Sequence, residues 1–141
     1  MVARKRRGFR LRDFRGVNPE QVAKLEAQGI RYTEQLLAAG GTHGDRAALA
    51  AKAGVPESVV LELVRLSDLA RLPGVKGIRA RLYYDAGVDS IERMAAWEPQ
   101  ALLRMLGDYV ERTGFDGIAP LPKEVQSCVA RARGLPRIVE Y

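Results

Sequence analysis

The chain has very few of the residues on which catalysis and metal binding usually depend. Among its 141 residues there is one cysteine, Cys128, and one histidine, His43. A single cysteine excludes an internal disulfide and a cysteine-based zinc site, and a single histidine excludes a multi-histidine metal site. We interpret Cys128 as a small packing residue on the last helix and His43 as a surface residue in a glycine loop. The sequence predicts no bound metal and no cofactor.

Long apolar runs are also missing. No stretch approaches the roughly 18 residues that a membrane-spanning helix needs. The basic start, Arg4 to Arg7, leads into Gly8-Phe9-Arg10 and not into the apolar stretch of a secretory signal. Together with the low cysteine content, this predicts a cytoplasmic protein without a membrane span.

The patterns that announce common enzyme classes are absent as well. The loop around His43 lacks the lysine and hydroxyl residue that end a phosphate-binding P-loop. Ser67 has no histidine at a spacing that suggests an acyl-transfer triad. Asp85 and Asp89 fit helix-end positions better than a metal pair. We therefore expect a protein that is not an enzyme.

The positive charge, by contrast, is concentrated. The net charge is +6, and residues 1–15 account for all of it, with seven basic residues and one acidic residue, Asp13. The remaining 126 residues hold 16 basic and 16 acidic side chains. Such an arm attracts polyanions, nucleic acid first and an anionic membrane surface second. The alternative is a solubilising tail.

Turn residues divide the rest of the chain into helices, with no strand alternation. Asn18 and Pro19 are typical of a helix start, and Gly29 and Gly54 are typical of helix ends. The expected helices cover residues 19–28, 33–39, 45–52, 56–69, 78–86, 90–97, 99–113 and 122–133. The predicted fold class is all-α.

An internal repeat appears at an offset of 58 residues. Gly16-Val17-Asn18 matches Gly74-Val75-Lys76, and Gly29-Ile30 matches Gly87-Val88. Each copy reads as a loop, a helix of about ten residues, a glycine corner and a short helix. Two such amphipathic units can bury their apolar faces against each other, which predicts one compact domain built from duplicated units.

The loop from Leu72 to Gly77 has the features of a helix-hairpin-helix motif. Gly74 allows the positive φ of a tight reversal, and Val75 is expected to point back between the helices. Gly77 or its neighbour opens the next helix, whose free amides suit a phosphate oxygen. The cations expected to bind phosphates nearby are Arg71, Lys76, Arg79 and Arg81. The alternative is a helix corner that only packs.

The sequence from Arg12 to Leu135 also resembles a known family. The matching residues are Gly16-Val17-Asn18 with Gly29-Ile30, Ala53-Gly54-Val55 with Leu66-Ser67-Asp68-Leu69, Gly74-Val75-Lys76 with Ala86-Gly87-Val88, and Pro120-Leu121-Pro122. They are similar to an uncharacterised bacterial family of tandem helix-hairpin-helix proteins, the domain-of-unknown-function family numbered 4332. The resemblance implies an all-helical, SAM-like fold and no assigned activity. Related hairpins in DNA repair and replication proteins hold the sugar-phosphate backbone without reading bases.

The first copy departs further from the hairpin pattern than the second. Asn18 and Lys76 stand where the pattern has its second glycine, and Gln21 and Ala23 stand where the second copy has Arg79 and Arg81. We therefore expect a degenerate first unit over residues 12–70 and the contacting unit over residues 71–135. Residues 1–11 form the basic arm and residues 136–141 a tail without predicted structure.

The function predicted from these features is sequence-tolerant binding of a nucleic-acid backbone, DNA in preference to RNA. The predicted contacts are Gly74, Val75, Lys76, Gly77, Arg79, Arg81 and Arg71, with Arg4, Lys5, Arg6 and Arg7 in the arm. The alternative is a protein-interaction module in which the hairpins only pack and the arm binds an acidic partner.

Overall fold

The computed structural model describes residues 8–141, so the predicted contacts Arg4, Lys5, Arg6 and Arg7 lie outside the described residues. The described chain forms eight α-helices and one short 3-10 helix. Its only β-type pairing is an isolated bridge between Arg10 and Tyr32. The predicted all-α class is confirmed. No helix in this part of the chain is long and apolar enough to cross a membrane.

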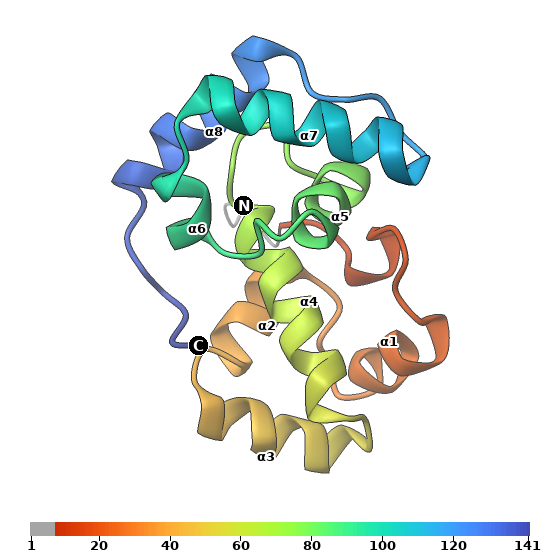
Figure 1. Ribbon diagram of the computed structural model, residues 1–141. Coiled ribbons are helices and arrows are strands. Elements are labelled where there is room, and N and C mark those ends of the chain that lie inside the picture. The colour runs from red at the N-terminus through yellow and green to blue at the C-terminus, as the bar shows by residue number, and fades with distance from the viewer. Residues whose placement is uncertain (1–7) are drawn as a thin grey trace, which may run out of the picture.

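Four helices make up the lower half of the view in Figure 1 and its central axis. They are α1 (Pro19–Glu26), α2 (Thr33–Ala39), α3 (His43–Ala53) and α4 (Glu57–Leu69). The predicted caps are present: the Asn18 side chain accepts a hydrogen bond from the Glu20 amide at 2.9 Å, and Gly54 ends α3 at φ +74°. Local turn chemistry therefore sets where these helices begin and end.

Four further helices make up the upper half (Figure 1). They are α5 (Gly77–Asp85), α6 (Ile91–Ala96), α7 (Pro99–Thr113) and α8 (Pro122–Gly134). Ser90 caps α6 by accepting a hydrogen bond from the Arg93 amide at 3.0 Å. The start of α5 is one residue earlier than predicted, at Gly77.

A single apolar core runs through both halves. Helix α4 packs on α2, α3 and α5, and α8 packs on α6 and α7. The largest fully buried side chains come from both halves and include Leu25, Leu36, Leu66, Tyr83, Met94, Leu102 and Leu106. Because α4 belongs to the lower half and contacts α5 in the upper half, it joins the two halves.

The helix starts follow the spacing seen in the sequence. Helices α1 and α5 begin at residues 19 and 77, and α2 and α6 begin at residues 33 and 91, so both pairs differ by 58. The corner glycines Gly29 and Gly87 also share a positive φ, at +83° and +95°. That the two halves are duplicated helix-hairpin-helix units remains an interpretation of this spacing.

The described end of the predicted arm is packed against the fold. Leu11 is fully buried in the 3-10 helix Leu11–Asp13. Its amide donates to the Arg31 carbonyl at 2.9 Å. Phe9 and Thr33 exchange two hydrogen bonds, Phe9 N to Thr33 Oγ1 at 3.1 Å and Thr33 N to the Phe9 carbonyl at 2.8 Å. Residues 8–11 therefore hold the chain against the start of α2.

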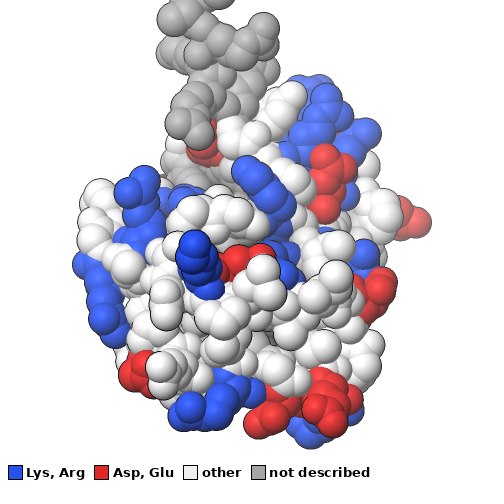
Figure 2. Space-filling model, turned by 90° about the horizontal axis from the view of Figure 1, so that it is seen from above, with Lys and Arg blue, Asp and Glu red and all other residues white. Residues whose placement is uncertain are grey.

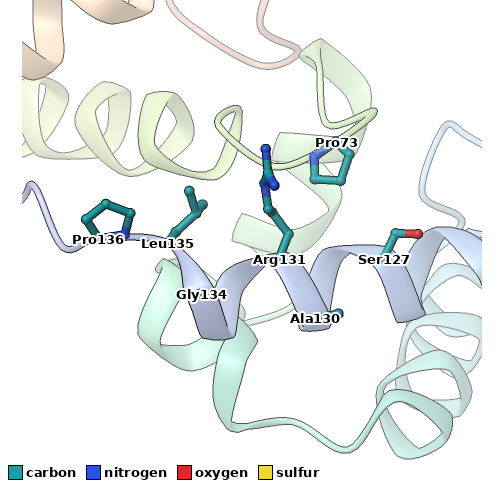
Figure 3. A pocket seen from close by; sticks show the side chains of 7 residues that line it. All are labelled: Pro73, Ser127, Ala130, Arg131, Gly134, Leu135 and Pro136. Carbon is teal, nitrogen blue, oxygen red and sulfur yellow. The ribbon is translucent and has the colours of Figure 1, made fainter.

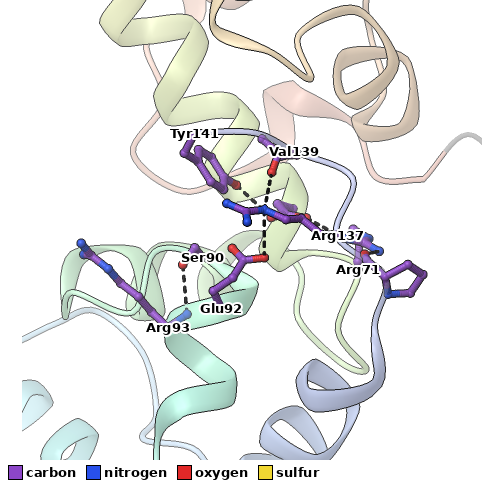
Figure 4. Close-up of polar contacts among 9 residues, drawn as sticks. Arg71, Ser90, Glu92, Arg93, Arg137, Val139 and Tyr141 are labelled. Atoms are coloured by element: carbon purple, nitrogen blue, oxygen red, sulfur yellow. Dashed lines mark hydrogen bonds and ion pairs between the residues drawn. The ribbon is translucent and has the colours of Figure 1, made fainter.

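The last residues, for which no structure was predicted, cross from α8 back to the lower half (Figures 1 and 4). The Glu140 amide donates to the Gly41 carbonyl at 2.8 Å, and Val139 is buried. The Tyr141 hydroxyl donates to the buried Asp68 carboxylate at 2.8 Å. We call residues 136–141 the C-terminal strap, because they bind to both halves of the chain.

Candidate nucleic-acid interface

The reversal between α4 and α5 has the backbone geometry that the sequence predicts. Gly74 has φ +72°, a conformation that L side chains rarely adopt. Val75 is buried, and its amide donates to the Leu72 carbonyl at 3.2 Å. Lys76 occupies the N-cap position of α5, and no side chain caps this helix. The loop therefore has a tight turn, an apolar anchor and an uncapped helix start.

Gly77 is needed for a close approach between two backbones. A Cβ atom at this position would lie 2.3 Å from the Asp13 carbonyl oxygen. The Arg15 amide donates to the Gly77 carbonyl at 3.3 Å. Residues 13–15 thus cover one side of the first turn of α5, and Gly77 is buried. The structure gives this glycine a packing role that the sequence did not indicate.

Arg81 faces the interior, contrary to the exposed position that a phosphate contact requires. It is only 7% exposed. Its guanidinium contacts Glu62 at 2.6 Å and Asp85 at 3.5 Å, and Nε donates to the Arg15 carbonyl at 2.6 Å. Two carboxylates and a carbonyl occupy its donors, so in this structure Arg81 joins α4, α5 and the N-terminal segment and is unavailable to a ligand.

Arg71 and Arg79 are partly exposed, but each has an acidic partner. Arg71 pairs with Asp68 at 2.8 Å and donates to the Pro136 carbonyl at 2.8 Å (Figure 4). Arg79 pairs with Glu124 at 3.1 Å and donates to the Ile118 carbonyl. Their charges are therefore largely balanced within the protein.

Lys76 differs from these arginines. Its side chain is exposed, and within residues 8–141 it makes no ion pair or side-chain hydrogen bond. It stands at the mouth of the hairpin, directly before the uncapped first turn of α5. Of the four predicted hairpin cations, Lys76 is the one that the structure leaves available.

A groove next to this loop brings in a second cation that the sequence did not reveal. Helix α8 packs on the hairpin, with the Cys128 thiol donating to the Pro73 carbonyl at 3.6 Å. The open groove beside this contact is lined by Pro73, Ser127, Ala130, Arg131, Gly134, Leu135 and Pro136. Figure 3 shows Arg131 rising from α8 toward the hairpin loop, beside Pro73. Arg131 is exposed and, in the described chain, makes no ion pair or hydrogen bond. No local pattern relates residue 131 to residue 73, so only the tertiary structure brings them together.

The remaining surface has charges of both signs. On the face shown in Figure 2, basic and acidic side chains are both present, and uncharged residues separate the basic groups from one another. On this face, the basic groups therefore form no continuous surface for a polyanion.

Two groups next to the hairpin, the Cys128 thiol and the Tyr83 hydroxyl, are held in their neutral forms. Burial raises the pKa of the Cys128 thiol, and burial also raises the pKa of the neighbouring Tyr83 hydroxyl. A protonated thiol is a poor nucleophile. Among residues 8–141, no three His, Cys, Asp or Glu side chains gather where they could hold a metal ion. What the hairpin region offers to a ligand is therefore contact surface and positively charged side chains.

The fold and this site define a helical protein with a glycine hairpin and, beside it, a groove lined by one unpartnered arginine, Arg131. Residues 15–135 match the family described as a domain of unknown function, DUF4332, and the chain belongs to this family. The predicted family is thus confirmed, over nearly the range expected. Neither a curated protein nor a solved structure matches the chain. The family carries no assigned function, so any functional conclusion depends on the geometry described above.

Proposed function

We propose that this protein is a non-catalytic cytoplasmic module that binds the sugar-phosphate backbone of nucleic acid, DNA in preference to RNA, without reading the bases. The observation that carries the proposal is a pair of unpartnered cations beside the hairpin loop: Lys76, which belongs to the loop, and Arg131 on α8, which lines the groove next to Pro73. The start of α5 beside Lys76 has no side-chain cap.

A phosphate oxygen suits this location for two reasons. Amides of an uncapped first turn point out of a helix and give it a partial positive charge. Lys76 adds a full charge on a flexible stem, and Arg131 adds a planar guanidinium that can bind two phosphate oxygens. Contacts from these groups to phosphate oxygens carry no sequence information, so the proposed binding is tolerant of sequence. Arg4, Lys5, Arg6 and Arg7 would extend the electrostatic reach.

Fluorescence anisotropy with an arbitrary labelled duplex tests the proposal. Binding should weaken steeply with salt, with a log-log slope of about −4 for four to five neutralised phosphates. The double variant K76A/R131A should reduce the magnitude of this slope by about 2, because two phosphate contacts are lost. K52A is the matched control, since Lys52 is exposed near the end of α3, away from the groove.

The outcome also depends on the arm. Deletion of residues 1–7 should weaken binding to every duplex by a similar factor. A changed preference among sequences would contradict backbone-only recognition. No binding at low salt, or equal affinities for K76A/R131A and K52A, would show that the groove is not the contact surface.

A second candidate function is protein interaction, and one observation favours it. Arg71, Arg79 and Arg81 all pair with carboxylates of the protein itself, as expected of hairpins that only pack. In that case the arm would address an acidic protein partner. Absence of duplex binding at low salt would support this function over the first.

A further inference from the structure

The loop between α7 and α8 carries two strongly exposed aliphatic side chains. Ile118 is 81% exposed and Leu121 is 63% exposed. Ile78, on the neighbouring first turn of α5, is 40% exposed, and we call these three residues the aliphatic patch. Among the described residues, one other large hydrophobic side chain is exposed, Ile138 at 48% on the C-terminal strap. A group of such side chains at one place marks an interaction surface.

Contacts with α5 hold this loop in place. A Cβ atom on Gly117 would lie 3.0 Å from Ile78 Cγ2, so loop and helix are in close contact. The Arg79 guanidinium donates to the Ile118 carbonyl. The loop backbone is therefore bonded to the protein, while the Ile118 side chain remains in solvent.

The carboxylates on either side of the patch are already paired within the chain. Asp116 pairs with Arg15, and Glu124 pairs with Arg79 at 3.1 Å. Each of these two ion pairs has a net charge of zero, so neither makes the rim of the patch acidic.

The surplus charge around the patch is positive. Lys76 directly precedes the first turn of α5, and Lys123 follows Leu121 by two residues. Both lysines are exposed and, in the part of the chain that the structure describes, form no ion pair. The segment that covers the start of α5 has one unpaired acid, Asp13, and one unpaired arginine, Arg10, which balance each other. The surplus therefore consists of the two lysines.

The basic arm joins the described chain close to this place. A Cβ atom on Gly77 would lie 3.5 Å from the Phe9 ring. The arm therefore meets the described chain one residue before a side chain that reaches the start of α5. Residues 4–7 of the arm are all basic, so they add to the positive charge that is attached near the aliphatic patch.

We propose that the aliphatic patch docks this protein on the surface of an anionic lipid bilayer. Such a surface has phosphate groups above a hydrocarbon layer, so aliphatic side chains can enter the boundary of that layer while flanking lysines meet the phosphates. This inference goes beyond the proposed binding of nucleic acid, although Lys76 takes part in both.

The combination of apolar and positive groups favours lipid over the other occupants. A sugar-phosphate backbone has charge for the lysines but no hydrocarbon layer for Ile118 and Leu121. A second copy of the chain has an apolar surface, but it would bring Lys76 and Lys123 toward lysines of the same charge. An anionic bilayer matches both parts of the patch.

Co-sedimentation of the full chain, freed of nucleic acid, with lipid vesicles tests this proposal. Vesicles of phosphatidylglycerol mixed with phosphatidylcholine should bind the chain at low salt, and vesicles of phosphatidylcholine alone should bind it at least about tenfold more weakly. Soluble glycerol phosphate, added at matched ionic strength, has the phosphate but no hydrocarbon and should leave the binding unchanged.

Two variants separate the apolar part from the charged part. I118S/L121S should weaken binding to the anionic vesicles by about tenfold or more, because two aliphatic side chains no longer enter the bilayer. I138S is the matched control and should bind like the unchanged chain. K123A should weaken binding by about fivefold at low salt, whereas K52A, on the exposed end of α3, should not. Since Ile118 and Leu121 are exposed, circular dichroism should show an unchanged fold.

Several results would overturn the proposal. No binding to anionic vesicles at low salt would leave the patch to a protein partner. Equal binding of I118S/L121S and I138S would show that the aliphatic side chains stay outside the bilayer. Displacement by glycerol phosphate would show phosphate binding without lipid.

The duplex assay separates this proposal from the proposed function. I118S/L121S should bind the labelled duplex like the unchanged chain, while K76A/R131A should bind it less tightly. A loss of duplex binding in I118S/L121S would assign the patch to the nucleic-acid contact and would also overturn the proposal. Failure of the unchanged chain to bind any duplex would refute the proposed function and leave the vesicle result as it is.

Discussion

Removing the Arg81 guanidinium should destabilise the fold much more than removing a hairpin cation at the surface. Arg81 is 9% exposed at its side chain and pairs with Glu62, which is 26% exposed. The variant R81M keeps the aliphatic stem but leaves the Glu62 carboxylate and the Arg15 carbonyl without their donor. Loss of one partner of a buried ion pair costs about 3–5 kcal/mol. Because water reaches part of Glu62, we expect the low end, about 3 kcal/mol.

Urea denaturation followed by far-UV circular dichroism measures this loss. With a denaturant dependence of about 2 kcal/mol per molar urea for a chain of this size, the midpoint should fall by about 1.5 M. K76M is the control, since Lys76 is exposed and its replacement should change the free energy of unfolding by less than about 0.5 kcal/mol. Adding E62M to R81M should restore part of the loss, because it removes the unpaired carboxylate.

A midpoint for R81M within experimental error of K76M would refute the reasoning, since Arg81 would then be dispensable for the fold. A double variant R81M/E62M less stable than R81M by the full cost of a second substitution would show that the Glu62 carboxylate gains nothing from its partner. Either outcome would mean that the Arg81–Glu62 ion pair does not stabilise the fold.

Three further perturbations follow from contacts described above. Y141F removes the hydrogen bond to the buried Asp68 and should cost about 1.5 kcal/mol of unfolding free energy, measured by thermal unfolding, because Arg71 still satisfies the other carboxylate oxygen. G77A places a methyl group against a backbone carbonyl at 2.3 Å and should lower the melting temperature, whereas G107A, inside α7 with open space around it, should raise it. Two backbone amides at the start of α7 hold the pKa of Glu98 below its usual 4.5. The ionised cap therefore stabilises the fold at neutral pH and loses this effect as the pH falls through the lowered pKa. The melting temperature should consequently differ less between pH 7 and pH 3 for E98Q than for the unchanged chain.

Each of these has a contrary outcome. Equal melting temperatures for Y141F and the unchanged chain would mean that the strap binds without its phenol. Equal changes in melting temperature for G77A and G107A would mean that the segment before α1 shifts away from the new methyl group at little cost in free energy. An E98Q variant with the same acid dependence as the unchanged chain would assign that dependence to other carboxylates.

Local patterns were sufficient for the helices. Asn18, Gly54 and Ser90 act through groups within three or four residues along the chain, so the sequence contains all that is needed to recognise them. The hairpin turn at Gly74 was predictable for the same reason. The patterns left out the structure of the first and last segments, because their partners are distant in sequence: the Glu140 carbonyl accepts from Arg46, 94 positions away.

In the candidate site, too, residues with local partners along the chain were predictable and residues with distant partners were not. Lys76 was predictable because it belongs to the turn itself. The burial of Arg81 depends on Glu62 from the preceding helix, although one local signal existed: Arg81 lies four residues after Gly77, on the same buried face of α5. Arg131 had no such signal, since it meets the hairpin only where α8 packs on it.

Each end segment packs against the half of the protein that is more distant from it along the chain. This limits where the chain can be cut into stable fragments. The segment before α1 contacts α5 through Arg15, and the C-terminal strap contacts α4 through Tyr141. A cut between α4 and α5 would therefore separate each end segment from the half that it contacts. The segment before α1 would stay with the lower half, and the C-terminal strap would stay with the upper half. We expect neither fragment to be stable alone and a mixture of the two to reassemble, so that a split version of this protein would report on the encounter of any two partners fused to its pieces.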